Sequence, residues 1–130
     1  MGRSLRVLLD THIYYWWTYQ EDRLSARALK AIKGSEETFV SLLCYWELAI
    51  KVKTGKMQAG TLLMEGPAKL PLEGFLLLGI EFRHLSGILD LPLHHRDPFD
   101  RLLIAQAKAE KLTIVSSDAV FDRYGVDRIW

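Results

Sequence analysis

Cysteine is almost absent from this sequence. Cys44 is the single cysteine among 130 residues, so no disulfide can form within the chain. A chain without an internal disulfide fits a reducing compartment, and we expect a cytoplasmic protein. Its length fits one domain, residues 1–130, that is large enough to bury a core.

The sequence also lacks an excess of charge of either sign. The 17 Lys and Arg residues nearly balance the 16 Asp and Glu residues, and the formal net charge is +1. No global basic field therefore indicates nucleic-acid or membrane binding, although a local acidic pocket with a metal ion could still bind a phosphate. No apolar run approaches the length of a membrane span, and the run in MGRSLRVLLD is too short for a signal peptide.

What the sequence does contain is short apolar runs that alternate with segments of helical pattern. We expect strands over 5–10, 38–42, 79–85, 112–118 and, at an edge, 126–130. We expect helices over 11–20, 26–35, 42–56, 97–111 and 118–125, with shorter helical pieces over 57–78 and 85–90. Ser25, Ser41 and Asp97 are the expected helix N-caps, and Asp10 or Thr11 could cap the first helix. This alternation indicates an α/β fold with a parallel sheet that is covered on both faces.

Four carboxylates lie where such a sheet could bring them together. Asp10 and Asp118 end strands, Glu47 lies on or beside the inward stripe of an apolar helix, and Asp100 opens a helix. Ligands of parallel sheets bind beyond the carboxyl ends of the strands. Clustered carboxylates repel one another, and their pKa values rise unless a cation is present. Mg²⁺ prefers oxygen ligands, so two to four carboxylates would form a reasonable site for it.

Helix capping is the alternative explanation for several of these acids. Asp97, just before Pro98, most simply caps its helix, and Asp100 could merely complement the helix dipole. Asp118 could cap the helix that follows it. Glu47 is the hardest to explain in this way, because a buried charge without a partner is costly.

Three segments resemble, in order, the motifs of PIN-domain proteins: LLDTHIYYWW, SLLCYWELAIKVKTGK and HRDPFDRLLIAQAKAEKLTIVSSDAVFDRYG. The likeness is strongest to the VapC-like toxins of bacterial toxin–antitoxin systems, and it runs from about Leu8 to the C-terminus. It implies a PIN-like α/β/α sandwich with a mainly parallel five-stranded sheet. It also implies a Mg²⁺- or Mn²⁺-dependent ribonuclease toxin with an RNA substrate (transfer RNA is a candidate), a cognate antitoxin and a homodimeric state.

The resemblance assigns roles to particular residues. The catalytic and metal-binding residues that it implies are Asp10, Glu47, Asp100 and Asp118, with Asp97 as a second-tier ligand. It gives supporting roles near the metal to Thr11 and to Ser117 or its neighbour Ser116. The implied reaction is hydrolysis of an RNA phosphodiester by a metal-activated water, with no protein nucleophile. Cys44 is then a packed small hydrophobe.

Other side chains are candidates for contact with RNA. Lys51, Arg101 and His94, with its neighbour His95, stand beside the acidic motifs and could meet phosphate, which supplies most non-specific affinity. Lysines on a solvated helix face, and an Arg101–Asp97 ion pair, are the alternatives.

The aromatic run Tyr14, Tyr15, Trp16, Trp17 and Tyr19 is too dense for one helix to bury on every side. We therefore expect an interface there, and base stacking is the less favoured alternative.

Other phosphate-handling classes fit less well. His12 stands where a haloacid-dehalogenase pattern needs a second Asp, and a receiver domain needs paired acids at the end of the first strand. Neither GxxxxGK nor GxGxxG occurs, and the histidines form no zinc pattern with Cys44. The alternative from a different class is a catalytically inactive PIN-fold module that binds another protein through the same fold.

Overall fold

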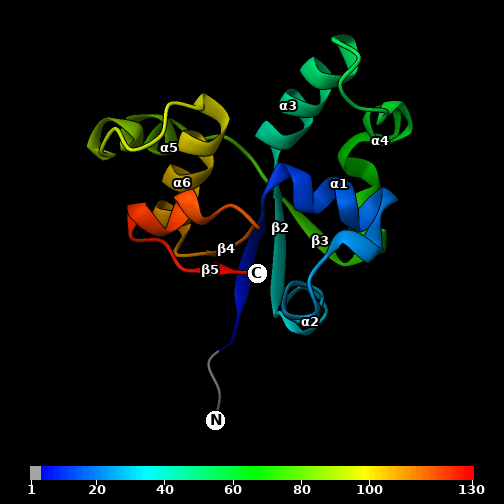
Figure 1. Cartoon of the computed structure of the whole chain (residues 1–130), viewed down its shortest axis with the longest axis horizontal. Coiled ribbons are helices and arrows are strands. Elements are labelled where there is room, and N and C mark those ends of the chain that lie inside the picture. The colour runs from blue at the N-terminus through cyan, green and yellow to red at the C-terminus, as the bar shows by residue number, and fades with distance from the viewer. Residues whose placement is uncertain (1–3) are drawn as a thin grey trace.

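The structure, a computed structural model, describes residues 4–130, so residues 1–3 at the charged start of the chain lie outside the described residues. One sheet contains five parallel strands in the order β3-β2-β1-β4-β5 (Figure 1). The strands are β1 (Arg6–Leu9), β2 (Glu37–Ser41), β3 (Phe75–Leu78), β4 (Thr113–Val115) and β5 (Arg128–Ile129). The parallel sheet and the edge position of the last strand are confirmed.

Helices cover both sides of this sheet. They are α1 (Thr11–Tyr19), α2 (Ala26–Gly34), α3 (Leu42–Lys53), α4 (Gly60–Glu65), α5 (Phe82–Gly87) and α6 (Pro98–Glu110). Short 3₁₀ helices are η1 (Glu21–Arg23), η2 (Gly66–Glu73), η3 (Ile88–Asp90) and η4 (Ala119–Tyr124). In Figure 1, α1 and α2 lie on one side of the central strands and α5 and α6 on the other. Within residues 4–130, no helix has the length and apolar character needed to cross a lipid bilayer.

The expected N-caps place the helices where the sequence predicts them. Ser25 Oγ accepts from the Ala28 amide at 3.0 Å, and Ser41 Oγ accepts from the Leu43 amide at 3.2 Å. Asp97 Oδ1 accepts from two amides at the start of α6. Asp10 occupies the N-cap position of α1, but its side chain makes no capping bond. The expected capping bond of Asp10 is therefore not made.

The strand predicted over 79–85 is wrong. The third strand is instead the apolar run Phe75–Leu78, which pairs with β2, and residues 82–87 form α5. His84 explains the helix, because its Nδ1 accepts from the Glu81 amide at 3.0 Å and so satisfies a donor at the helix start. Because His84 is fully buried, the sequence of this short helix looks as apolar as that of a buried strand, and the two cannot be told apart by pattern.

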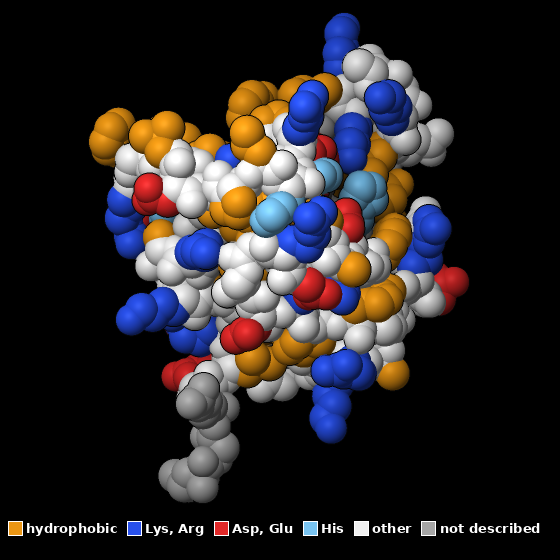
Figure 2. All heavy atoms as spheres, turned by 60° about the vertical axis from the view of Figure 1, so that its left-hand side comes forward, with side chains coloured by type: hydrophobic (Ala, Val, Ile, Leu, Met, Phe, Trp, Pro, Cys, Tyr) orange, Lys and Arg blue, Asp and Glu red, His pale blue; other side chains and the backbone are white. Residues whose placement is uncertain are grey.

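Most of the aromatic run is buried or half-buried within the chain, and the interface expected there stays a prediction. Tyr14 is buried and its hydroxyl hydrogen-bonds that of Tyr45 at 2.8 Å, while Trp17 packs on Phe75. Of the run, only Tyr19 is among the strongly exposed large hydrophobic residues. The most extensive exposed apolar groups lie elsewhere, on α3 (Leu42, Trp46, Ile50) and along residues 82–93 (Phe82, Leu85, Leu89, Leu93). Figure 2 shows exposed apolar side chains gathered along the top of the molecule.

Candidate metal centre

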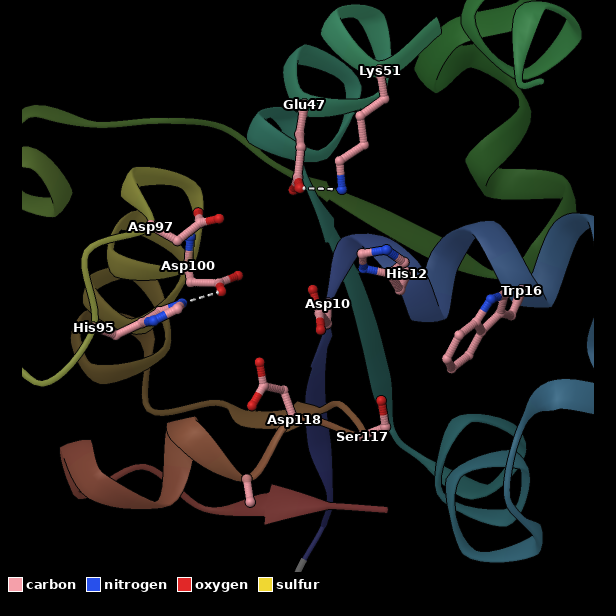
Figure 3. Close-up of a pocket in the computed structure, with 11 residues that line it drawn as sticks. Asp10, His12, Trp16, Glu47, Lys51, His95, Asp97, Asp100, Ser117 and Asp118 are labelled. Carbon is pink, nitrogen blue, oxygen red and sulfur yellow. Dashed lines mark hydrogen bonds and ion pairs between the residues drawn. The ribbon is translucent and has the colours of Figure 1, made fainter. Parts of the chain in front are cut away.

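A cavity of about 640 Å³ opens beyond the carboxyl ends of β1 and β4 (Figure 3). Its lining consists of Asp10, His12, Trp16, Glu47, Lys51, His95, Asp97, Asp100, Ser117, Asp118 and Ala119. The structure thus brings together all five carboxylates singled out in the sequence. They come from the end of β1, from α3, from the start of α6 and from the segment after β4, which are far apart along the chain.

Asp10 is one of the two most buried acids of this cavity, together with Glu47. Its amide donates to the Val115 carbonyl at 3.1 Å, which extends the pairing of β1 with β4 and fixes the backbone. The side chain is only 8% exposed, and Ser116 Oγ donates to its Oδ2 at 2.7 Å. Burial raises the pKa of Asp10, the charge of Glu47 adds to the rise, and the Ser116 hydrogen bond opposes it.

Glu47 enters the cavity from α3 and is 7% exposed. Lys51, one helical turn later, places its Nζ 2.9 Å from Glu47 Oε2, as Figure 3 shows. The Lys51 ammonium is therefore engaged by Glu47 in this structure, although it lines the cavity as a phosphate-binding side chain would. A buried hydrogen bond from Ser41 Oγ to Gln106 Oε1, at 2.6 Å, joins the start of α3 to α6. The helices that carry Glu47 and Asp100 are fixed to each other by this bond.

Asp100 faces Asp10 from the first turn of α6. Its Oδ2 lies 2.7 Å from His95 Nε2, and the ligand atoms of His95, Asp97 and Asp100 all lie within 4.8 Å of one another. Burial, followed by the charge of Asp10, raises the pKa of Asp100 to about 7, while the His95 contact opposes the rise. Asp97 caps the helix as predicted and also lines the cavity, so capping and ligation do not exclude each other.

Asp118 lies at the exposed rim of the cavity. Its Oδ1 caps η4 by accepting from the Val120 amide at 3.0 Å, and its own amide donates to Ser116 Oγ at 3.0 Å. Ser116 is fully buried and so connects Asp118 to Asp10, whereas Ser117 is exposed on the cavity wall. Of the two serines, Ser116 is therefore the one whose hydroxyl contacts an acid of the cavity, and the supporting role stays a prediction.

Two predicted supporting or substrate contacts lie outside the cavity lining. Thr11 is buried, and it is not among the residues that line the cavity. His94 packs its ring edge-on against Tyr124 at 5.4 Å, and the neighbouring His95 enters the cavity instead. Cys44 is fully buried, which raises the pKa of its thiol to about 12 and confirms its packing role.

Arg101 is likewise absent from the cavity lining. Its guanidinium donates to the carbonyls of Ile88, Leu91, Pro92 and His95, with the shortest distance, 2.9 Å, to Pro92. This arginine therefore fixes the segment before α6, neither reaching toward a substrate nor pairing with Asp97. By holding that segment, it also fixes the backbone of His95.

The donor set fits a hard divalent cation. Carboxylate oxygens dominate it, and among residues 4–130 only Lys51 and His95 contribute a direct side-chain ion pair or hydrogen bond to the carboxylates of Glu47 and Asp100. Burial raises the pKa values of Asp10 and Asp100, with repulsion between the acids adding to the rise, so ionisation of these groups has a free-energy cost in the protein alone. A bound cation with oxygen preference would compensate it.

Comparison with known protein families shows to which family this chain belongs. The model of the PIN domain family matches residues 7–127, a range that includes all the carboxylates of the cavity. The chain belongs to the PIN-domain family. It is 31% identical over 113 residues to ribonuclease VapC22 of Mycobacterium tuberculosis, a match that covers 86% of each sequence.

Solved structures support the fold. A chain of VapBC2 from Rickettsia felis bound to a promoter DNA fragment aligns with a TM-score of 0.64 at 17% identity, covering 95% of this chain and 97% of that one. A chain of FitAB bound to an IR36 DNA fragment aligns with a TM-score of 0.69 at 15% identity, covering 94% and 92%. At these identities the likeness concerns the fold alone, and it confirms the predicted PIN-like architecture.

Proposed function

We propose that this chain is a Mg²⁺- or Mn²⁺-dependent endoribonuclease and the toxin of a toxin–antitoxin pair. The observation that carries the proposal is the convergence of Asp10, Glu47 and Asp100, from three separate elements, on one cavity. Membership of the PIN-domain family and the similarity to a VapC ribonuclease support the same activity.

In this proposal the buried acids hold the cation. Asp10, Glu47 and Asp100 would be its ligands, Asp118 would support it from the rim, and Asp97 would act as a second-tier ligand while it fixes the first turn of α6. When bound, a divalent cation supplies an activated water and stabilises charge on the phosphoryl group. Lys51 pairs with Glu47 in this structure, and if Glu47 held a cation the Lys51 ammonium would be free to contact a phosphate of the RNA.

The proposed partners follow from this activity and from the relatives. RNA, with transfer RNA as a candidate, is the substrate, and the solved relatives from toxin–antitoxin systems support a cognate antitoxin. We assign a homodimer contact to the exposed apolar side chains of α3 and of residues 82–93, because such groups are costly to leave in water. We place the protein, as one domain over residues 1–130, in the cytoplasm where its RNA substrate occurs.

The test is cleavage of structured RNA by the purified chain without antitoxin, in Mg²⁺, in Mn²⁺ and in EDTA. We expect cleavage that needs the metal and that is abolished in Asp10→Asn and in Glu47→Gln, both of which stay folded. Asp122→Asn is the matched control, because Asp122 is exposed and pairs with Arg128 outside the cavity. If the wild type cleaves no RNA with either metal, the inactive protein-binding module becomes the better description.

A further inference from the structure

One aromatic side chain of α1 borders the acidic cavity. Trp16 is half-buried and lines the cavity together with Asp10 and the other acids. In Figure 3 the Trp16 indole and the His12 ring extend from α1 on the opposite side of Asp10 from Asp97 and Asp100. A group seated at the acids would therefore have an indole beside it, away from α6.

The indole is held in place by its neighbours. The Arg23 guanidinium lies over the ring at 5.0 Å from the centroid, and the rings of Trp130 and His12 lie 5.9 Å and 6.0 Å away. A cation over an indole face is attractive, and it also restricts the rotamers of both side chains. Trp16 is thus positioned before any ligand binds, which lowers the entropy cost of binding.

The neighbouring Trp17 has a structural role, and its contacts differ from those of Trp16. Trp17 packs on Phe75 at 5.3 Å, and its Nε1 donates to Glu73 Oε2 at 3.2 Å. Among residues 4–130, Trp16 Nε1 has no recorded hydrogen-bond partner, and no buried polar side-chain atom is left unsatisfied. The Trp16 N–H is therefore accessible as a donor, whereas that of Trp17 is used.

We propose that Trp16, supported by Arg23, is a nucleobase-binding platform for the nucleotide next to the scissile phosphate. This inference rests on the proposed ribonuclease activity and adds the contact that orients the strand. Proteins bind unpaired RNA bases by stacking them on aromatic rings, and this contact accepts any base. A phosphodiester seated at the acids would bring a flanking base to the Trp16 side, so the platform would favour an unpaired nucleotide at the cut.

The experiment compares Trp16→Leu, Trp16→Phe and the control Trp17→Leu on a synthetic RNA stem-loop. The stem-loop spans a site that the wild type cuts in total transfer RNA. A matched set of stem-loops carries an abasic nucleotide at each position around the cut. We expect Trp16→Leu to lower kcat/KM about tenfold or more on intact RNA, in keeping with the energy of base–aromatic stacking. Trp16→Phe should retain most activity, and Trp17→Leu should show no such loss once its folded fraction is measured.

The abasic set separates stacking from a change in fold. For the wild type, removal of one flanking base should lower kcat/KM to a similar extent, and Trp16→Leu should add little on that RNA. Equal cleavage by the wild type at every abasic position overturns the platform, whatever the variants do. So does an equal loss by Trp16→Leu on intact and abasic RNA.

A failure of the platform can be told apart from a failure of the nuclease proposal. Cleavage that does not depend on Trp16 overturns the platform alone. Binding of fluorescently labelled total transfer RNA to Asp10→Asn is measured in parallel with the cleavage assays. If the wild type does not cleave and Asp10→Asn does not bind, both proposals are overturned.

Discussion

Replacing Asp100 by Asn should stabilise the protein in the absence of metal while it abolishes cleavage. Asp100 is 19% exposed, and burial beside Asp10 raises its pKa from 3.8 to about 7. A shift of about 3 pKa units corresponds to about 4 kcal/mol against the charged form, at about 1.4 kcal/mol per unit. Loss of the charged hydrogen bond with His95 offsets part of this gain. We expect a net gain of about 2–4 kcal/mol for Asp100→Asn at pH 8.

The gain should depend on pH in one direction. The pKa of Asp100 is higher in the folded state than in the unfolded state. Below about pH 4 the residue is protonated in both states, so its ionisation does not lower the free energy of unfolding of the wild type. As the pH rises from about 4 through 7, the unfolded chain releases this proton before the folded chain does, and the wild type loses stability relative to the variant. The difference should be small at pH 4 and constant above about pH 8.

The assay is thermal unfolding in EDTA across this pH range, repeated with saturating Mn²⁺. At pH 8 without metal we expect the variant to melt roughly 5–15 °C above the wild type, given the usual size of unfolding entropies. Mn²⁺ should raise the Tm of the wild type much more than that of the variant, because the variant lacks one of the proposed ligands of the cation. A variant that melts below the wild type at pH 8 in EDTA, or that gains equally from Mn²⁺, would refute the reasoning.

Three further outcomes are expected. Ser116→Ala removes the 2.7 Å hydrogen bond to Asp10 Oδ2, so RNA cleavage should fall about tenfold and the pKa of Asp10, followed by NMR, should rise further. Asp118→Asn should reduce activity less than Asp10→Asn, because Asp118 is at the exposed rim and Asn can keep the η4 cap; kcat/KM for one RNA compares the two. Arg101→Met should lower the free energy of unfolding by about 1–3 kcal/mol in denaturant titrations, because it leaves backbone carbonyls of residues 88–95 without a donor.

The convergence of the acids could be predicted from the sequence because it follows from topology. Parallel strands present their carboxyl ends at one edge, so Asp10 and Asp118 had to meet once their strands were recognised. The first turn of a helix that begins beside that edge carries Asp100 to the same place. Glu47 could be singled out because its helix is apolar and because burying a charged side chain without a partner costs free energy.

What could not be predicted is which of two neighbouring residues turns inward. His94 and His95 have the same chemistry, as do Ser116 and Ser117, and only the backbone angles of each loop decide which one faces the acids. The hydrogen bonds of Arg101 and the bond between Ser41 and Gln106 join segments that are distant in the sequence. No local periodicity carries that information. The predicted third strand is misplaced for a related reason. The burial of His84 in a short helix depends on the packing of the folded chain, and in the sequence the residue looks like part of an apolar run.

The DPFDR motif shows how one segment meets the structural and the chemical requirement together. Asp97 caps α6 through the amides of Phe99 and of Asp100 itself, so the residue that starts the helix also holds the backbone of the residue that faces the cavity. Arg101 fixes the preceding segment and, with it, the backbone of His95, which contacts Asp100. The Asp97 cap and the His95 contact thus hold the carboxylate of Asp100 near Asp10. The raised pKa values of the two acids show that their charged forms are disfavoured there. Without a cation, this clustering of acids does not stabilise the fold. A bound divalent cation would offset the repulsion between the carboxylates.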